Sequence, residues 1–134
     1  MKDGVKYLSV MLALIAALAL GAGPASAADN IKPDMGALKG RWVRPDGGYI
    51  IAITNIDGSG KMEAAYYNPK PINVSKAQAT REGGVIKVFI ELRGPGYPGS
   101  TYTLTYDPKT DELAGIYYQA VMQQNFDVVF VRTK

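Results

Sequence analysis

The sequence predicts an all-β protein, an antiparallel up-and-down β-barrel of about eight strands preceded by one short helical turn. Three observations lead to this prediction. Apolar side chains recur at every second position in many short stretches, as they do in half-buried strands. Clusters of Gly, Pro, Asp and Asn separate these stretches by hairpin-length links. No long window after residue 40 shows helical spacing of apolar residues, and no link is long enough for a crossover helix.

Residues 1–27 have the pattern of a cleaved secretory signal peptide. Lys2 and Lys6 precede an almost wholly apolar run over 8–20, and 24–27 offer small residues at a cleavage position. The run is short for a membrane span, although an uncleaved anchor would share part of this pattern. We therefore expect a periplasmic or secreted protein that does not span a membrane after signal cleavage.

The remaining chain is expected to form a lead-in over 28–39 and a barrel domain over 40–134. In the lead-in, Asp34 can cap one turn of helix. In the barrel, residues 86–92 have the clearest strand pattern, and the longest break is expected over the Gly/Pro-rich segment 93–100. The expected strands are 41–44, 49–56, 62–67, 72–80, 86–92, 101–106, 113–119 and 126–132.

Successive hairpins form a meander, and closing a meander into a barrel removes its edges. A two-sheet sandwich has a very similar sequence pattern and stays open as an alternative. In a meander, alternate links lie at the same end. One end therefore collects the links 45–48, 68–71, 93–100 and 120–123, which carry most of the Pro residues. Loops often carry function, so a functional site is expected at this end.

The composition excludes several kinds of chemistry. His and Cys are both absent, which removes disulfides, thiol nucleophiles, the usual general base and the common zinc and haem ligands. Asp46, Asp57, Asp107 and Asp111 occur in turns, where Asp is expected for turn chemistry alone. The net charge is only +3 and the basic residues are scattered, unlike a nucleic-acid-binding surface. We expect no enzymatic activity, no cofactor, no metal site and no nucleic-acid partner.

The segment Gly40-Arg41-Trp42 opens the first strand after a helical lead-in, and the turn at Asp57-Gly58 leads into 62–67. In these features the chain resembles the calycin superfamily, the lipocalins and avidins. The resemblance implies a barrel floor formed by Gly40, Trp42 and Arg132, with the guanidinium over the indole. The meander independently places Trp42 and Arg132 at one end. The chain departs from the avidins in having a single Trp, which argues against a biotin pocket.

Tyrosine is the most informative aromatic residue, with 9 copies against 3 of Phe. Several fall on inward faces, where a buried hydroxyl needs a hydrogen-bond partner, either in a filled polar network or in a bound ligand. A barrel of this strand number either fills itself or holds one small molecule. The candidate ligand-binding residues are Tyr66, Asn68, Tyr97, Tyr117 and Gln119.

Two functions of different classes follow from this pattern. The first is an exported protein that binds a small molecule at the Tyr/Pro-rich end of the barrel. The second is a protein-binding module, such as an inhibitor of a secreted hydrolase, in which Tyr97 on the 93–100 loop inserts into a partner. A structural role in the cell envelope is a third possibility. The sequence does not choose among them, nor does it give the oligomeric state.

Overall fold

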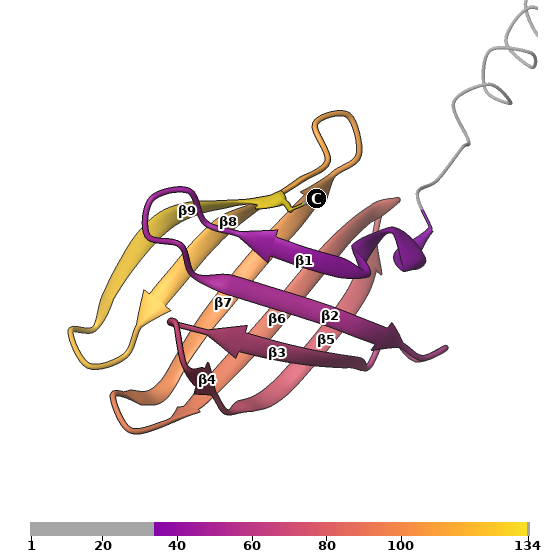
Figure 1. Ribbon diagram of the computed structural model, residues 1–134. Coiled ribbons are helices and arrows are strands. Elements are labelled where there is room, and N and C mark those ends of the chain that lie inside the picture. Colours follow the sequence, from indigo (N-terminus) through magenta and orange to yellow (C-terminus); the bar gives the residue numbers. More distant parts are fainter. Residues whose placement is uncertain (1–33, 134) are drawn as a thin grey trace, which may run out of the picture. The chain divides into compact units, whose positions relative to one another are not determined.

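A computed structural model of the protein describes residues 34–133, which form one antiparallel sheet curled into a nearly closed barrel (Figure 1). A single 3-10 turn, η1, precedes the strands in this part of the chain. The elements are η1 (Met35–Leu38), β1 (Gly40–Val43), β2 (Ile50–Ile56), β3 (Met62–Tyr67), β4 (Pro71–Ile72), β5 (Val74–Glu82), β6 (Val85–Gly94), β7 (Tyr97–Asp107), β8 (Glu112–Gln119) and β9 (Gln124–Arg132). The predicted signal peptide, 1–27, lies outside the described residues.

The strand order is β4-β3-β2-β1-β9-β8-β7-β6-β5, so the first strand, β1, lies beside the last strand, β9. Trp42 on β1 pairs with Arg132 on β9. The seam between β3 and β5 closes at one end, through a bridge between Lys61 and Gln78 and a 2.7 Å hydrogen bond from the Ala79 N–H to the Gly60 carbonyl. The prediction of an antiparallel all-β barrel is therefore confirmed, whereas the count is nine strands rather than eight.

The ninth strand arises because the predicted strand 72–80 is split at Asn73. β4 pairs with β3, whereas β5 pairs with β6 on the other side of the seam. Between them the Asn73 carbonyl accepts a 3.0 Å hydrogen bond from the Arg93 N–H. The single predicted strand is therefore two strands, because the chain changes partner strand at Asn73 without leaving the barrel wall.

The segment 93–100 is not the long break that the sequence suggested. β6 and β7 continue through it and are joined by the two residues Pro95 and Gly96. Gly96 has a φ of +80°, and Pro followed by Gly at positive φ is typical of a type II turn. Gly99, with a φ of +97°, is an extra residue in the β6–β7 register and forms a bulge. The glycines thus serve a tight hairpin instead of a loop.

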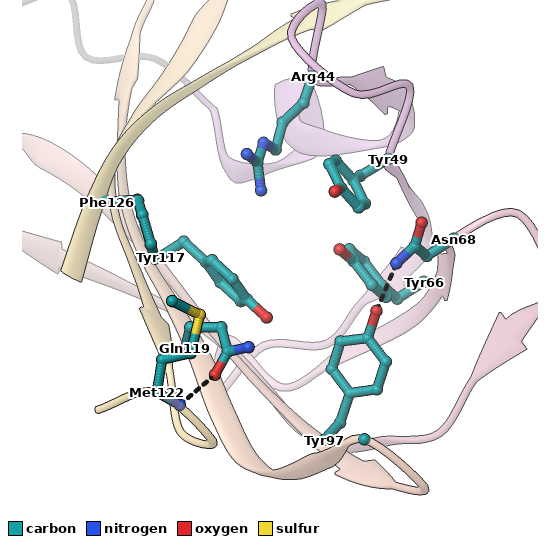
Figure 2. Close-up of a pocket in the computed structure, with 10 residues that line it drawn as sticks. Arg44, Tyr49, Tyr66, Asn68, Tyr97, Tyr117, Gln119, Met122 and Phe126 are labelled. Atoms are coloured by element: carbon teal, nitrogen blue, oxygen red, sulfur yellow. Dashed lines mark hydrogen bonds between the residues drawn. The ribbon is translucent and has the colours of Figure 1, made fainter. Parts of the chain in front are cut away.

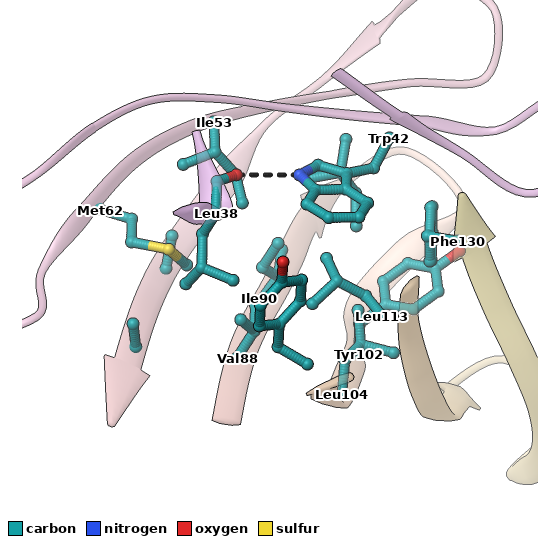
Figure 3. Close-up of a cluster of buried hydrophobic side chains, with 14 of the residues drawn as sticks. Leu38, Trp42, Ile53, Met62, Val88, Ile90, Tyr102, Leu104, Leu113 and Phe130 are labelled. Atoms are coloured by element: carbon teal, nitrogen blue, oxygen red, sulfur yellow. Dashed lines mark hydrogen bonds between the residues drawn. The ribbon is translucent and has the colours of Figure 1, made fainter. Parts of the chain in front are cut away.

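Apolar side chains fill the end of the barrel next to η1. Figure 3 shows Trp42 and Leu38 facing Ile90 and Phe130 across this interior. The Trp42 Nε1–H donates a 2.9 Å hydrogen bond to the Leu38 carbonyl, which fixes η1 against β1. Asp34 caps η1, because its carboxylate accepts a hydrogen bond from the Gly36 N–H. The described residues include no helix with the length and apolar character needed to cross a bilayer.

Candidate ligand-binding site

Arg132 closes the floor of the barrel, beneath the apolar core. Its guanidinium carbon lies 4.2 Å from the centre of the Trp42 ring. The same group donates to the Lys39 carbonyl at 2.7 Å and to the Ala37 carbonyl, and it forms two hydrogen bonds with the Asp111 carboxylate. These contacts tie the last strand to the lead-in and to the β7–β8 turn.

Gly40 is needed beside this guanidinium. Its φ is +135°, and a Cβ at this position would lie 2.7 Å from the Arg132 Nη1. The structure thus brings together Gly40, Trp42 and Arg132, the three residues expected at the floor. Asp111 was not expected at the floor; hydrogen bonds from Arg132 lower the pKa of its carboxyl group. Only the folded chain places this turn residue beside β9.

The opposite end of the barrel is hollow and contains a pocket of about 500 Å³ (Figure 2). All the candidate ligand-binding residues named from the sequence line it, although they come from separate strands and turns. These residues are Tyr66, Asn68, Tyr97, Tyr117 and Gln119. The other lining residues, which the sequence analysis did not select, are Arg44, Tyr49, Gly96, Met122 and Phe126.

Arg44 is the main residue that sequence reasoning missed. It follows Trp42 by two positions, so the alternation of β1 directs both side chains to the interior. The residue is 8% exposed. Its Nε and Nη2 bind the two carboxylate oxygens of Asp46 at 3.0 and 2.7 Å, and its Nη1 donates to the Tyr102 hydroxyl at 2.9 Å. The guanidinium also lies over the Tyr49 ring, 4.4 Å from its centre.

These partners keep Arg44 charged inside the barrel. Burial acts to lower the pKa of Arg44, but the hydrogen bonds to Asp46 and Tyr102 outweigh it and raise the pKa. The guanidinium therefore contributes a permanent positive charge to the inner end of the pocket. Among the described residues that line the pocket, it is the one charged side chain.

A network of tyrosines forms the inner end and walls of the pocket. The Tyr102 hydroxyl, fully buried, accepts from Arg44 and shares a 2.9 Å hydrogen bond with the Tyr66 hydroxyl. The Tyr102 and Tyr117 rings stack with centres 4.5 Å apart, and the Tyr49 and Tyr66 rings are nearly parallel. The walls of the pocket are therefore flat, aromatic and fixed by contacts with one another.

The side chains nearer the mouth leave donors facing the cavity. The Asn68 Nδ2 donates to the Tyr97 hydroxyl at 2.6 Å, so Tyr97 turns into the pocket instead of projecting from its hairpin (Figure 2). The Gln119 Oε1 accepts from the Met122 N–H at 2.8 Å, which directs the Gln119 amide nitrogen toward the cavity. The Tyr117 hydroxyl also points into this space. Together they offer hydrogen-bond donors to a ligand that carries acceptors.

Burial raises the pKa of Tyr102 to about 12 and also raises the pKa of Tyr66. A tyrosine with a raised pKa stabilises the fold fully below its unfolded pKa of about 10, and that contribution is lost as pH rises through the folded value. For Tyr102 the free energy of unfolding that is lost between these two pKa values is roughly 2 to 3 kcal/mol. We expect the free energy of unfolding, measured in urea, to fall between about pH 10 and pH 12.

Tyr102→Phe tests the origin of this alkaline decline. The variant leaves an Arg44 N–H and the Tyr66 hydroxyl without their partner, so it should lower the free energy of unfolding at neutral pH by about 1 to 2 kcal/mol. Its decline with rising pH should be shallower than that of the wild type, because one buried hydroxyl no longer titrates. Parallel stability curves for the two proteins would show that Tyr102 does not contribute.

Residues 34–133 contain no group of three or more acidic side chains placed to hold a metal ion. Comparisons with protein-family models, curated proteins and solved structures found no match for the chain. The nearly closed antiparallel barrel is compatible with a calycin-like fold. Any function must therefore be argued from the pocket itself.

Proposed function

We propose that the protein is an exported, non-enzymatic binding protein that holds a small molecule in the tyrosine-lined pocket. The observation that supports this most is that a hollow of about 500 Å³, lined by aromatic and polar side chains, lies at the end of the barrel opposite the apolar core beside η1. This volume falls within the range of small-molecule sites. The pocket also combines apolar aromatic walls with a few converging polar groups, which is the usual composition of such sites.

The same residues support a binding role over catalysis. The lining residues within 34–133 include no His, Cys, Asp or Glu, which are the side chains that most often transfer protons or attack substrates. Burial raises the pKa of the Tyr117 hydroxyl, so this group stays protonated near neutral pH and acts as a donor. A calycin-like ligand-binding barrel is the more specific form of the proposal.

Binding of a protein partner is the alternative, and one observation favours it. Val121 and Met122, in the β8–β9 turn at the rim of the pocket, are 61% and 56% exposed. Large apolar side chains at such a position suit contact with another protein. Tyr97 would not be the inserting residue, however, because its hydroxyl is held by Asn68 inside the pocket. We therefore place the small-molecule function first.

Native mass spectrometry tests this proposal on protein purified gently from its natural source. The wild-type protein should retain a small-molecule mass. Tyr117→Ala should lose it, because the variant removes one aromatic wall of the pocket and a donor, a change expected to weaken binding by about tenfold or more.

Tyr118→Ala is the matched control for that experiment. Tyr118 is the next residue on β8 and pairs with Thr101 and Asn125, so the alternation of the strand places it on the outer face. This variant should keep the small molecule. A protein mass in place of a small one would favour the partner-binding alternative, and no retained mass in any sample would favour a structural role.

A further inference from the structure

We infer that the pocket selects small planar carboxylates, with the carboxylate at Arg44 and the ring between the tyrosine walls. This inference rests on the proposed function and names its ligand class. The charge of the pocket favours an anion. Arg44 places a positive charge at the inner end of a cavity whose other described lining residues are uncharged. A buried charge acts strongly on groups nearby, so an anion is favoured there and a cation is disfavoured.

Asp46 does not use up the binding capacity of this guanidinium. A guanidinium has five N–H groups. Asp46 takes the one on Nε and one on Nη2, and Tyr102 takes one on Nη1. One N–H therefore remains on each terminal nitrogen, so the guanidinium can still donate two hydrogen bonds to an anion. Figure 2 shows the guanidinium at the edge of the cavity, with a nitrogen directed into the space between Tyr117 and Tyr49.

The charges of Asp46 and Arg44 are also exposed to solvent to different degrees. The Asp46 side chain is 60% exposed, whereas that of Arg44 is 10% exposed. Water and salt screen the carboxylate of Asp46 on the outside of the barrel. The guanidinium is the buried member of the ion pair and faces the cavity, so the electrostatic potential inside the pocket stays positive.

The shape of the walls selects a flat ligand. The Tyr49 and Tyr66 rings lie within 7° of parallel, and Tyr117 faces them across the cavity (Figure 2). Planar rings stack well on such surfaces. The hydroxyl of Tyr117 and the amide nitrogen of Gln119 lie on the side of the cavity opposite Arg44 (Figure 2). There they can donate to an acceptor on the ligand's ring, at the end away from its carboxylate.

Three probes with the same ring and different charges test the ligand class by isothermal titration calorimetry. They are 2-naphthoate, 2-naphthamide and 2-naphthylmethylammonium. The wild-type protein should bind the carboxylate at least about tenfold more tightly than the amide, because hydrogen bonds between two charged groups are the stronger ones. The ammonium compound should bind most weakly. Saturated decahydro-2-naphthoate, which keeps the charge but is not flat, should bind several-fold more weakly than 2-naphthoate.

Two variants then test whether Arg44 causes the preference for the carboxylate. Arg44→Gln should remove the difference between 2-naphthoate and 2-naphthamide. Arg93→Gln, which removes an exposed arginine ion-paired with Glu91, should keep it. Circular dichroism checks that Arg44→Gln is folded. If it is not, the order of affinities of the wild-type protein for the probes tests the ligand class. Persistence of the preference in folded Arg44→Gln would overturn the role of Arg44.

The possible failures are distinguishable. If the amide or the ammonium compound binds as tightly as the carboxylate, the inferred ligand class is wrong, whereas the proposed binding function stands. If decahydro-2-naphthoate binds as tightly as 2-naphthoate, the requirement for a planar ring is wrong. If no naphthyl probe of any charge binds, both the ligand class and the small-molecule function are overturned.

Discussion

Gly115→Ala should lower the free energy of unfolding by about 3 kcal/mol or more. A Cβ at this position would lie 2.0 Å from the carbonyl oxygen of Thr103 and 2.9 Å from the Cα of Leu104. Both are backbone atoms of β7, so no side-chain rotation can relieve the overlap. β8 approaches β7 so closely here that only glycine fits.

Gly94→Ala is the matched control, because Gly94 also lies in a strand, and no described atom beyond its two chain neighbours would lie within 4 Å of an added Cβ. Its stability should change by less than about 1 kcal/mol. Urea unfolding of both variants beside the wild type makes the comparison. Equal stabilities of the two variants would contradict the close approach of β7 and β8.

Arg132→Ala should be the second strongly destabilising change, by about 3 kcal/mol. It removes a cation from the face of Trp42 and leaves two lead-in carbonyls without their donor. The Asp111 carboxylate loses both hydrogen bonds from Arg132 and keeps the one from Tyr106. The last strand would then lose its tie to η1. Urea unfolding measures the loss, and Arg132→Lys should recover part of it, because an ammonium keeps the charge but not the geometry of the donors.

Arg93→Ala provides the comparison for this variant. Arg93 is a surface arginine with one carboxylate partner, Glu91, and its side chain is 59% exposed. Exposed ion pairs contribute little, so the loss should stay below about 1 kcal/mol. If Arg132→Ala were no more harmful than Arg93→Ala, the contacts of Arg132 would not close the barrel as described.

The sequence could predict the fold class because alternation by two is a local property of each strand. It could also predict which links share an end, because a meander with short links leaves no other arrangement. This is why Trp42 and Arg132 were expected to meet, and why residues as distant as Tyr66 and Gln119 were placed in one candidate site. The resemblance carried by Gly40-Arg41-Trp42 also implied the meeting of Trp42 and Arg132, and the topology supported it independently.

What the sequence could not predict depends on contacts between distant strands. The role of Arg44 at the pocket requires Tyr102, 58 residues away, to lie across the barrel and accept its hydrogen bond. The break at Asn73 depends on pairing with Arg93, and the bulge at Gly99 depends on the register of β6 against β7. Glycines indicate that a backbone must bend, but not whether it forms a loop or a bulge.

The side-chain amides of Asn68 and Gln119 allow the most direct test of the pocket as a binding site. Their NMR signals can be followed while each of the three naphthyl probes is added to the folded protein. We predict that both signals shift and saturate with at least one probe. The amide of Gln78, which donates to Ser59 at the seam of the barrel and away from the pocket, should not shift. Shifts at Gln78 with none at Asn68 and Gln119, or no shifts with any probe, would contradict the proposed binding function.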